Sequence, residues 1–147
     1  MTGKQKLLLI FLSLGFISLL VGCSMLQDMS DFKEKNFETK KEAQQLITNG
    51  WIPKEIPQNA SHIQVVYNID TNVVNGRFDS KPREIKKLLS TLSKTSSTRF
   101  QTETKALTSE YRKVSVAISK KPSDYYQNED YIFVVKNHRV YFFRRSK

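Results

Sequence analysis

Residues 131–145 read YIFVVKNHRVYFFRR and carry the clearest fold signal in this 147-residue chain. Two runs rich in aromatic and β-branched residues flank Asn137 and His138. Asparagine readily adopts the left-handed conformation that a two-residue turn requires. The stretch therefore predicts a β-hairpin with strands at 131–136 and 139–145.

The two-residue turn also determines which residues of the hairpin lie opposite each other. The predicted pairs are Val135–Val140 and Phe133–Phe142 on one face, and Val134–Tyr141 and Ile132–Phe143 on the other. Because both faces are apolar, either the hairpin lies in the centre of the sheet with cover on both sides, or one face is an exposed patch for a partner. We expect the covered arrangement.

Three further segments show the apolar–polar alternation of a half-buried strand. These strands are predicted at 62–69, 73–78 and 111–119. Asn75 and Gly76 interrupt the second of them. Polar composition predicts loops at 93–98 and 120–130.

Two segments carry helix signals. In the first, Thr39 and Glu42 fit a capping box, and Gly50 stands where a left-handed C-cap is expected. The second follows Ser80, a candidate N-cap, and has Pro82 in its first turn. Its apolar stripe consists of Ile85, Leu88, Leu89 and Leu92. Two helices and about five strands predict a small α+β fold with an antiparallel sheet.

The N-terminal residues have the pattern of an export signal. The uncharged apolar run at 7–21 has the length of a signal-peptide core and is short for a membrane-spanning helix. It ends in Leu20-Val21-Gly22-Cys23, which resembles the lipobox of bacterial lipoproteins. The resemblance implies cleavage between Gly22 and Cys23, with acyl chains such as palmitate attached at Cys23. The alternative is an uncleaved anchor helix.

This pattern predicts three parts of the chain: a signal peptide at 1–22, a lipidated flexible tether at 23–36 and a single α+β domain at 37–147. The expected location is the bacterial cell envelope, where the lipidated Cys23 holds the protein to the membrane. By the lipoprotein sorting rule, Ser24 in place of Asp implies the periplasmic face of the outer membrane if the host has two membranes.

The residues that carry most enzyme chemistry are scarce. One cysteine and two histidines rule out an internal disulfide framework and a Cys/His zinc site. No phosphate-binding glycine loop, nucleophile elbow or HExxH motif is present in the sequence. We therefore predict no catalytic residue, no metal and no cofactor. Trp51, which follows the first helix, is interpreted as a core residue rather than a ligand platform.

Charge is distributed unevenly along the chain. Residues 23–80 carry 6 basic and 8 acidic side chains, whereas residues 81–147 carry 16 basic and 6 acidic side chains. This asymmetry predicts either a face that binds an anionic envelope component or an acidic protein, or a solvated surface without a partner. Because export removes the protein from the cytosol, we expect no nucleic acid among its partners. The residues of the candidate basic face are Lys86, Lys87, Arg112, Lys113, Arg139, Arg144 and Arg145.

Residues 50–78, GWIPKEIPQNASHIQVVYNIDTNVVNGRF, resemble the head domain of YbbD-type small bacterial lipoproteins. The likeness rests on the spacing of residues such as Gly50, Trp51, Pro53, Asp70 and Gly76. It implies a surface-anchored domain without an established activity. The expected function is therefore a non-catalytic binding module in the envelope. The alternatives are an immunity or exclusion lipoprotein that blocks a toxin or transfer apparatus, and an accessory enzyme acting on cell-wall material.

Overall fold

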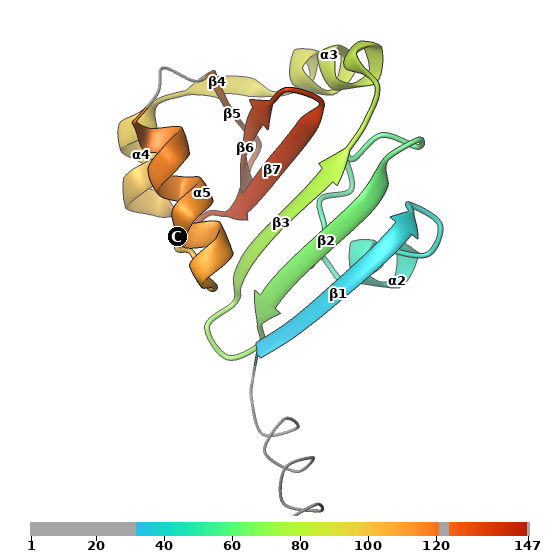
Figure 1. Ribbon diagram of the computed structural model, residues 1–147, viewed down its shortest axis with the longest axis horizontal. Coiled ribbons are helices and arrows are strands. Elements are labelled where there is room, and N and C mark those ends of the chain that lie inside the picture. The colour runs from blue at the N-terminus through green and yellow to red at the C-terminus, as the bar shows by residue number, and fades with distance from the viewer. Residues whose placement is uncertain (1–31, 121–123, 147) are drawn as a thin grey trace, which may run out of the picture. The chain divides into compact units, whose positions relative to one another are not determined.

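The computed structural model describes residues 32–120 and 124–146, which form an α+β fold (Figure 1). The predicted signal peptide and residues 23–31 of the predicted tether lie outside the described residues. Residues 32–147 form one compact unit. The described elements are β1 (Phe32–Thr39), α2 (Gln44–Thr48), β2 (Ser61–Asn68), β3 (Val73–Asp79), α3 (Pro82–Ser90), β4 (Ser93–Thr95), α4 (Ser97–Glu103), α5 (Ser109–Ser119), β5 (Tyr125–Gln127), β6 (Tyr131–Lys136) and β7 (Arg139–Arg144).

The strands form one antiparallel sheet in the order β1-β2-β3-β7-β6-β5-β4, which confirms the predicted fold class. The β6–β7 hairpin lies near its centre with the predicted register, including Phe133 opposite Phe142 and Val134 opposite Tyr141. Asn137 has a φ of 58°, as the tight turn requires. The turn chemistry therefore determines the pairing at the centre of the sheet.

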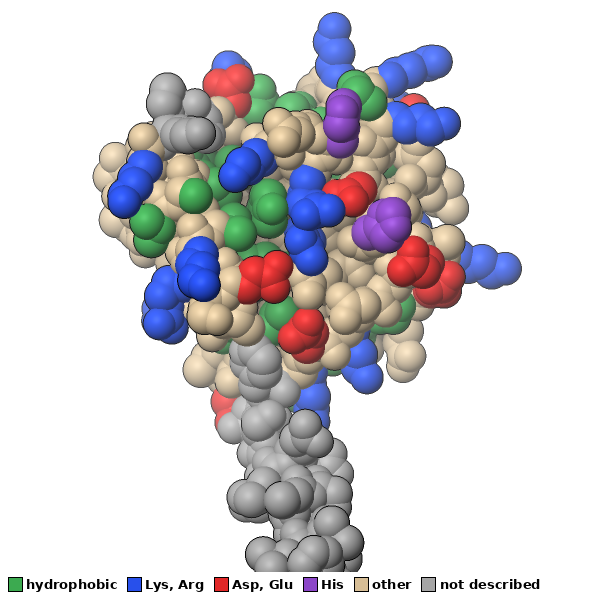
Figure 2. Space-filling model, in the orientation of Figure 1, with side chains coloured by type: hydrophobic (Ala, Val, Ile, Leu, Met, Phe, Trp, Pro, Cys, Tyr) green, Lys and Arg blue, Asp and Glu red, His purple; other side chains and the backbone are tan. Residues whose placement is uncertain are grey.

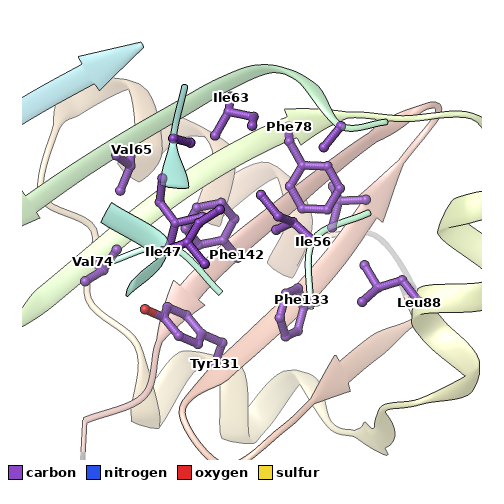
Figure 3. Packing of buried hydrophobic residues seen from close by; sticks show 14 of the residues in the cluster. Ile47, Ile56, Ile63, Val65, Val74, Phe78, Leu88, Tyr131, Phe133 and Phe142 are labelled. Carbon is purple, nitrogen blue, oxygen red and sulfur yellow. The ribbon is translucent and has the colours of Figure 1, made fainter. Parts of the chain in front are cut away.

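Both faces of the hairpin are covered, which confirms the expected arrangement. Phe133 and Phe142 pack beneath α2, α3 and the segment 51–60 in one cluster (Figure 3). Ile132 and Phe143 belong to a second cluster with residues of α4 and α5. Because neighbouring strand residues point to opposite faces, these two clusters lie on opposite sides of the sheet. The helices α3 and α5 therefore cover opposite faces.

The segment 111–119 is a helix, α5, so the predicted third strand is wrong. Val114, Val116 and Ile118 alternate as in a strand, but Tyr111, Val114 and Ile118 also follow helical spacing. The Thr108 hydroxyl caps this helix by accepting a hydrogen bond from the Tyr111 N–H. Val116 is 49% exposed, whereas Tyr111 and Ile118 are buried. Helical packing therefore takes precedence over the local alternation.

Other corrections concern the edges of the sheet. Residues 32–36, predicted to belong to the tether, form the first part of β1 and pair with β2. The predicted loops at 93–98 and 120–130 contain β4, the first residues of α4, and β5. β4 and β5 have three residues each, too few for a periodic pattern. β1 is an edge strand rich in charge, a composition that protects exposed strand edges but weakens the strand signal.

The helix signals are confirmed in part. Gly50 has a φ of 75°, and the Glu42 N–H donates to the Thr39 hydroxyl over 3.3 Å, although α2 itself begins only at Gln44. Pro82 begins α3 as predicted. Ser80 does not cap that helix, because its hydroxyl donates to Asn59 Oδ1 over 3.1 Å instead.

The strand β3 runs without a break through Asn75 and Gly76, so the predicted interruption is wrong. Asn75 is fully buried, and its side-chain amide donates to the Lys105 carbonyl while its Oδ1 accepts from the Leu107 N–H. This polar side chain therefore attaches the loop before α5 to the sheet. Gly76 lies against the Phe142 ring, which occupies the space of a side chain.

Candidate functional site

A cavity of about 470 Å³ lies at the end of the sheet where β3 begins and β7 ends. Several separate segments meet there: the β2–β3 turn, the loop before α5, the start of β6 and the C-terminal end of β7. We call it the sheet-end cavity. Its polar lining includes Thr71, Asn72, Lys105, Asp130, Arg144 and Arg145.

Arg144 is held in place by neutral groups. Its guanidinium donates to Asn72 Oδ1, to the Gly50 carbonyl and, over 3.1 Å, to the Tyr131 hydroxyl. It also lies 5.4 Å from the centre of the Trp51 ring and 5.3 Å from that of Tyr131. Neutral oxygens and aromatic faces orient the guanidinium without cancelling its charge. Arg144 therefore brings a fixed positive charge to the cavity.

The aromatic support beneath Arg144 is itself fixed. Trp51 stacks on Tyr67 with ring centres 4.5 Å apart and packs against the core, which agrees with its interpretation as a core residue. The Tyr131 hydroxyl donates to the Gly50 carbonyl over 2.7 Å. Burial raises the pKa of Tyr131 to about 12, so the hydroxyl keeps its proton at neutral pH.

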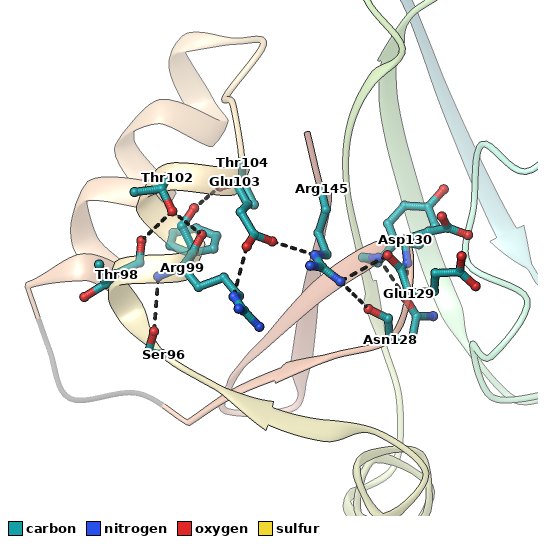
Figure 4. Close-up of polar contacts among 12 residues, drawn as sticks. Ser96, Thr98, Arg99, Thr102, Glu103, Thr104, Asn128, Glu129, Asp130 and Arg145 are labelled. Atoms are coloured by element: carbon teal, nitrogen blue, oxygen red, sulfur yellow. Dashed lines mark hydrogen bonds and ion pairs between the residues drawn. The ribbon is translucent and has the colours of Figure 1, made fainter. Parts of the chain in front are cut away.

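Arg145 joins the end of β7 to α4 and to the start of β6 (Figure 4). Its Nε donates to Glu103 over 2.6 Å, and its Nη1 donates to the Asn128 and Glu129 carbonyls over 3.1 Å. Glu103 also pairs with Arg99 over 2.9 Å. Two arginines therefore share this one carboxylate, and the local charge stays positive.

Lys105 completes the set of cations. Its backbone carbonyl is held by the buried Asn75, while its side chain is exposed at the cavity. Three basic side chains thus line the sheet-end cavity together with one carboxylate, Asp130, while Glu103 pairs with Arg145 from behind the lining. A concave site with this balance concentrates anions, since low-dielectric walls focus the field of the charges.

The predicted basic face is not one surface. Lys86 and Lys87 are exposed on α3, whereas Arg112 and Lys113 are exposed on α5, across the sheet. In the view of Figure 2, Lys and Arg side chains are spread over the surface and alternate with acidic ones. Only Arg144 and Arg145 of the predicted set meet in the sheet-end cavity.

Arg139 has a structural partner. It forms two hydrogen bonds with the Asp79 carboxylate, of 2.7 and 3.0 Å, across the β3–β7 pair. These bonds hold the pKa of Asp79 below its ordinary value. His62 lies 3.5 Å from the same carboxylate. The charge of Arg139 is therefore balanced within the fold.

A second basic hollow lies on the outer face of α5. Arg112, Lys113 and Lys120 surround Val116 there, and all lining residues belong to or directly follow this one helix. Such side chains keep their rotamer freedom, whereas Arg144 and Arg145 in the sheet-end cavity are fixed by contacts with distant segments. We therefore regard the sheet-end cavity as the candidate site.

Sequence reasoning did not identify Lys105, Asn72 or Asp130 as site residues. Lys105 reaches the cavity because Asn75, 30 positions away, binds its carbonyl. Within residues 32–120 and 124–146, no group of three or more His, Cys, Asp and Glu side chains could hold a metal ion. No helix in these same ranges is both long and apolar enough to cross a membrane.

Comparison with known proteins finds one similarity. Residues 31–79 match the family model of the YbbD head domain, which supports the resemblance noted in the sequence. The match covers β1, α2, β2 and β3, about a third of the chain, and includes the β2–β3 turn of the sheet-end cavity. No curated protein and no solved structure matches the chain.

Proposed function

We propose that this protein is a lipid-anchored bacterial envelope lipoprotein that acts as a non-catalytic binding module for an anionic group. The observation that carries the proposal is the sheet-end cavity, whose lining has three basic side chains, Lys105, Arg144 and Arg145, and one carboxylate, Asp130. Of the predicted basic face, the proposal keeps only Arg144 and Arg145, and it adds Lys105.

The anchor is supported by the sequence before the domain. The apolar run at 7–21 ends in the lipobox-like Leu20-Val21-Gly22-Cys23. The YbbD head match is compatible with an envelope lipoprotein. Each buried methylene of an acyl chain contributes about 0.8 kcal/mol, so two or three chains on Cys23 give durable attachment.

Fractionation of cells tests the anchor. In Cys23→Ser the protein loses its lipid attachment site, and we expect a high-salt wash, which removes peripherally bound protein, to release it from the membrane fraction. The matched control is Ser24→Ala, which keeps the cysteine and should stay in the membrane fraction. Membrane association that is unchanged in Cys23→Ser would mean that residues 7–21 are an uncleaved anchor.

Tryptophan fluorescence tests the anion site. Trp51 is the only tryptophan of the chain, and it contacts Arg144. Inorganic phosphate added to the lipid-free mature chain, residues 23–147 carrying Cys23→Ser, should change Trp51 emission in a saturable way. Lys105→Gln should weaken the apparent affinity about ten-fold, the order expected for one charged hydrogen bond.

The matched control for this titration is Lys86→Gln, an exposed lysine on α3 at the other end of the sheet. It removes the same charge and should leave phosphate binding unchanged. Equal weakening by both variants would reduce the effect to net charge and would count against the sheet-end cavity as a site.

A further inference from the structure

The chain enters the domain at the same end of the sheet as the sheet-end cavity. β1 begins at Phe32, which lies opposite Asn68, the last residue of β2. The β2–β3 turn that follows Asn68 supplies Thr71 and Asn72 to the cavity. Cys23 precedes Phe32 by nine positions, which span at most about 30 Å of extended chain. An anchor at Cys23 therefore keeps this end of the sheet close to the bilayer.

The same end carries an exposed apolar side chain. Ile69, in the β2–β3 turn, is 53% exposed, and Val116 is the other large hydrophobic residue that is exposed among the described residues. The turn is built rigidly, because Asn68 Oδ1 accepts from both the N–H and the hydroxyl of Thr71, over 2.8 and 2.9 Å. Ile69 is thus displayed in the same turn that supplies Thr71 and Asn72 to the sheet-end cavity.

We propose that this end of the domain docks onto the bilayer to which the protein is anchored, with the sheet-end cavity receiving the phosphate of an anionic lipid headgroup and Ile69 entering the interface. The inference rests on the proposed function and names its ligand. An apolar side chain beside basic ones is the combination that binds anionic membrane surfaces, because the apolar group enters the acyl boundary while the cations meet the headgroups. The short tether favours a headgroup over a protein partner.

The preorganised cations suit a phosphate group. Arg144 is oriented by Asn72, Gly50 and Tyr131, so little side-chain entropy is lost when it binds. Arginine donors match the geometry of phosphate oxygens, and the flexible Lys105 lines the same cavity. α3, with Lys86 and Lys87, follows the far end of β3 and is turned away from the bilayer in this orientation.

Vesicle binding by the lipid-free mature chain tests the proposal. Both hydrophobic clusters lie within residues 32–147, so this form retains the complete described core. We expect co-sedimentation with vesicles that contain phosphatidylglycerol and none with vesicles of phosphatidylcholine alone. Lys105→Gln should weaken binding about five-fold, the order expected for one cation lost near an anionic surface. Ile69→Ser should weaken it as well, and Lys86→Gln should not.

Two results would overturn the docking proposal and leave the anion site intact. One is saturable phosphate binding without any binding to phosphatidylglycerol vesicles, which would identify a site for free anions. The other is vesicle binding that Lys113→Gln on α5 weakens more than Lys105→Gln does, which would assign the membrane face to α5. If neither phosphate nor vesicles bind, the proposed function itself fails. Circular dichroism of each variant checks that the fold is retained.

Discussion

Gly76 lies in the middle of β3, where a Cβ atom would overlap the Phe142 ring. The ring cannot move aside easily, because Phe142 is fully buried and packs edge-on against Tyr131, with ring centres 5.9 Å apart. Gly76→Ala should therefore lower the free energy of unfolding by about 2–3 kcal/mol, the upper range for overpacking. Urea denaturation followed by circular dichroism measures this loss.

The control for Gly76→Ala is a variant that makes room for the new methyl group. Phe142→Leu alone should be destabilising, since it removes part of a buried ring. If the overlap causes the loss, Gly76→Ala should cost less in the Phe142→Leu background than in the natural chain. Additive losses in the double variant would show that the strand tolerates alanine badly for another reason.

Single elements could be predicted where local chemistry and tertiary packing agree. The β6–β7 hairpin follows from its two-residue turn and its aromatic pairs, and the structure has the predicted register. The helix α5 could not be predicted, because the Val114–Ile118 alternation also fits a strand and only packing against Phe143 distinguishes the two. β1 and β4 gave no signal, since edge strands are stabilised by their neighbours rather than by their own composition, and β5, which lies next to β4, has only three residues.

The candidate site was predictable only in part, for a related reason. Arg144 and Arg145 were identified because they stand in a charged C-terminal run. Their arrangement depends on partners far away in the sequence: Gly50 lies 94 positions before Arg144, and Glu103 lies 42 positions before Arg145. Net charge along the chain carries no information about such pairings, so the predicted face included lysines from both sides of the sheet.

The part of the chain that the structure describes is one sheet with a hydrophobic cluster on each side, and the central strands contribute to both. In β6, Phe133 points into the cluster beneath α3 while Ile132 points into the cluster beneath α5. Neither cluster can lose its packing without disturbing the strands that support the other. We therefore expect residues 32–147 to unfold in a single cooperative transition.

Substitutions in α5 test this coupling across the sheet. Ile118→Ala removes a buried side chain from the cluster beneath α5 and should lower the free energy of unfolding by about 2–5 kcal/mol. Trp51 lies on the other side of the sheet, packed against the cluster beneath α3. If the sheet transmits the loss, the urea midpoint seen by Trp51 fluorescence should fall as far as that seen by circular dichroism. The matched variant Val116→Ala changes an exposed position on the same helix and should change the free energy of unfolding by no more than about 0.5 kcal/mol with either probe. The contrary result is that Ile118→Ala lowers the urea midpoint seen by circular dichroism but leaves the midpoint seen by Trp51 fluorescence at the value of the natural chain. That result would mean that α4 and α5 unfold as a separate unit.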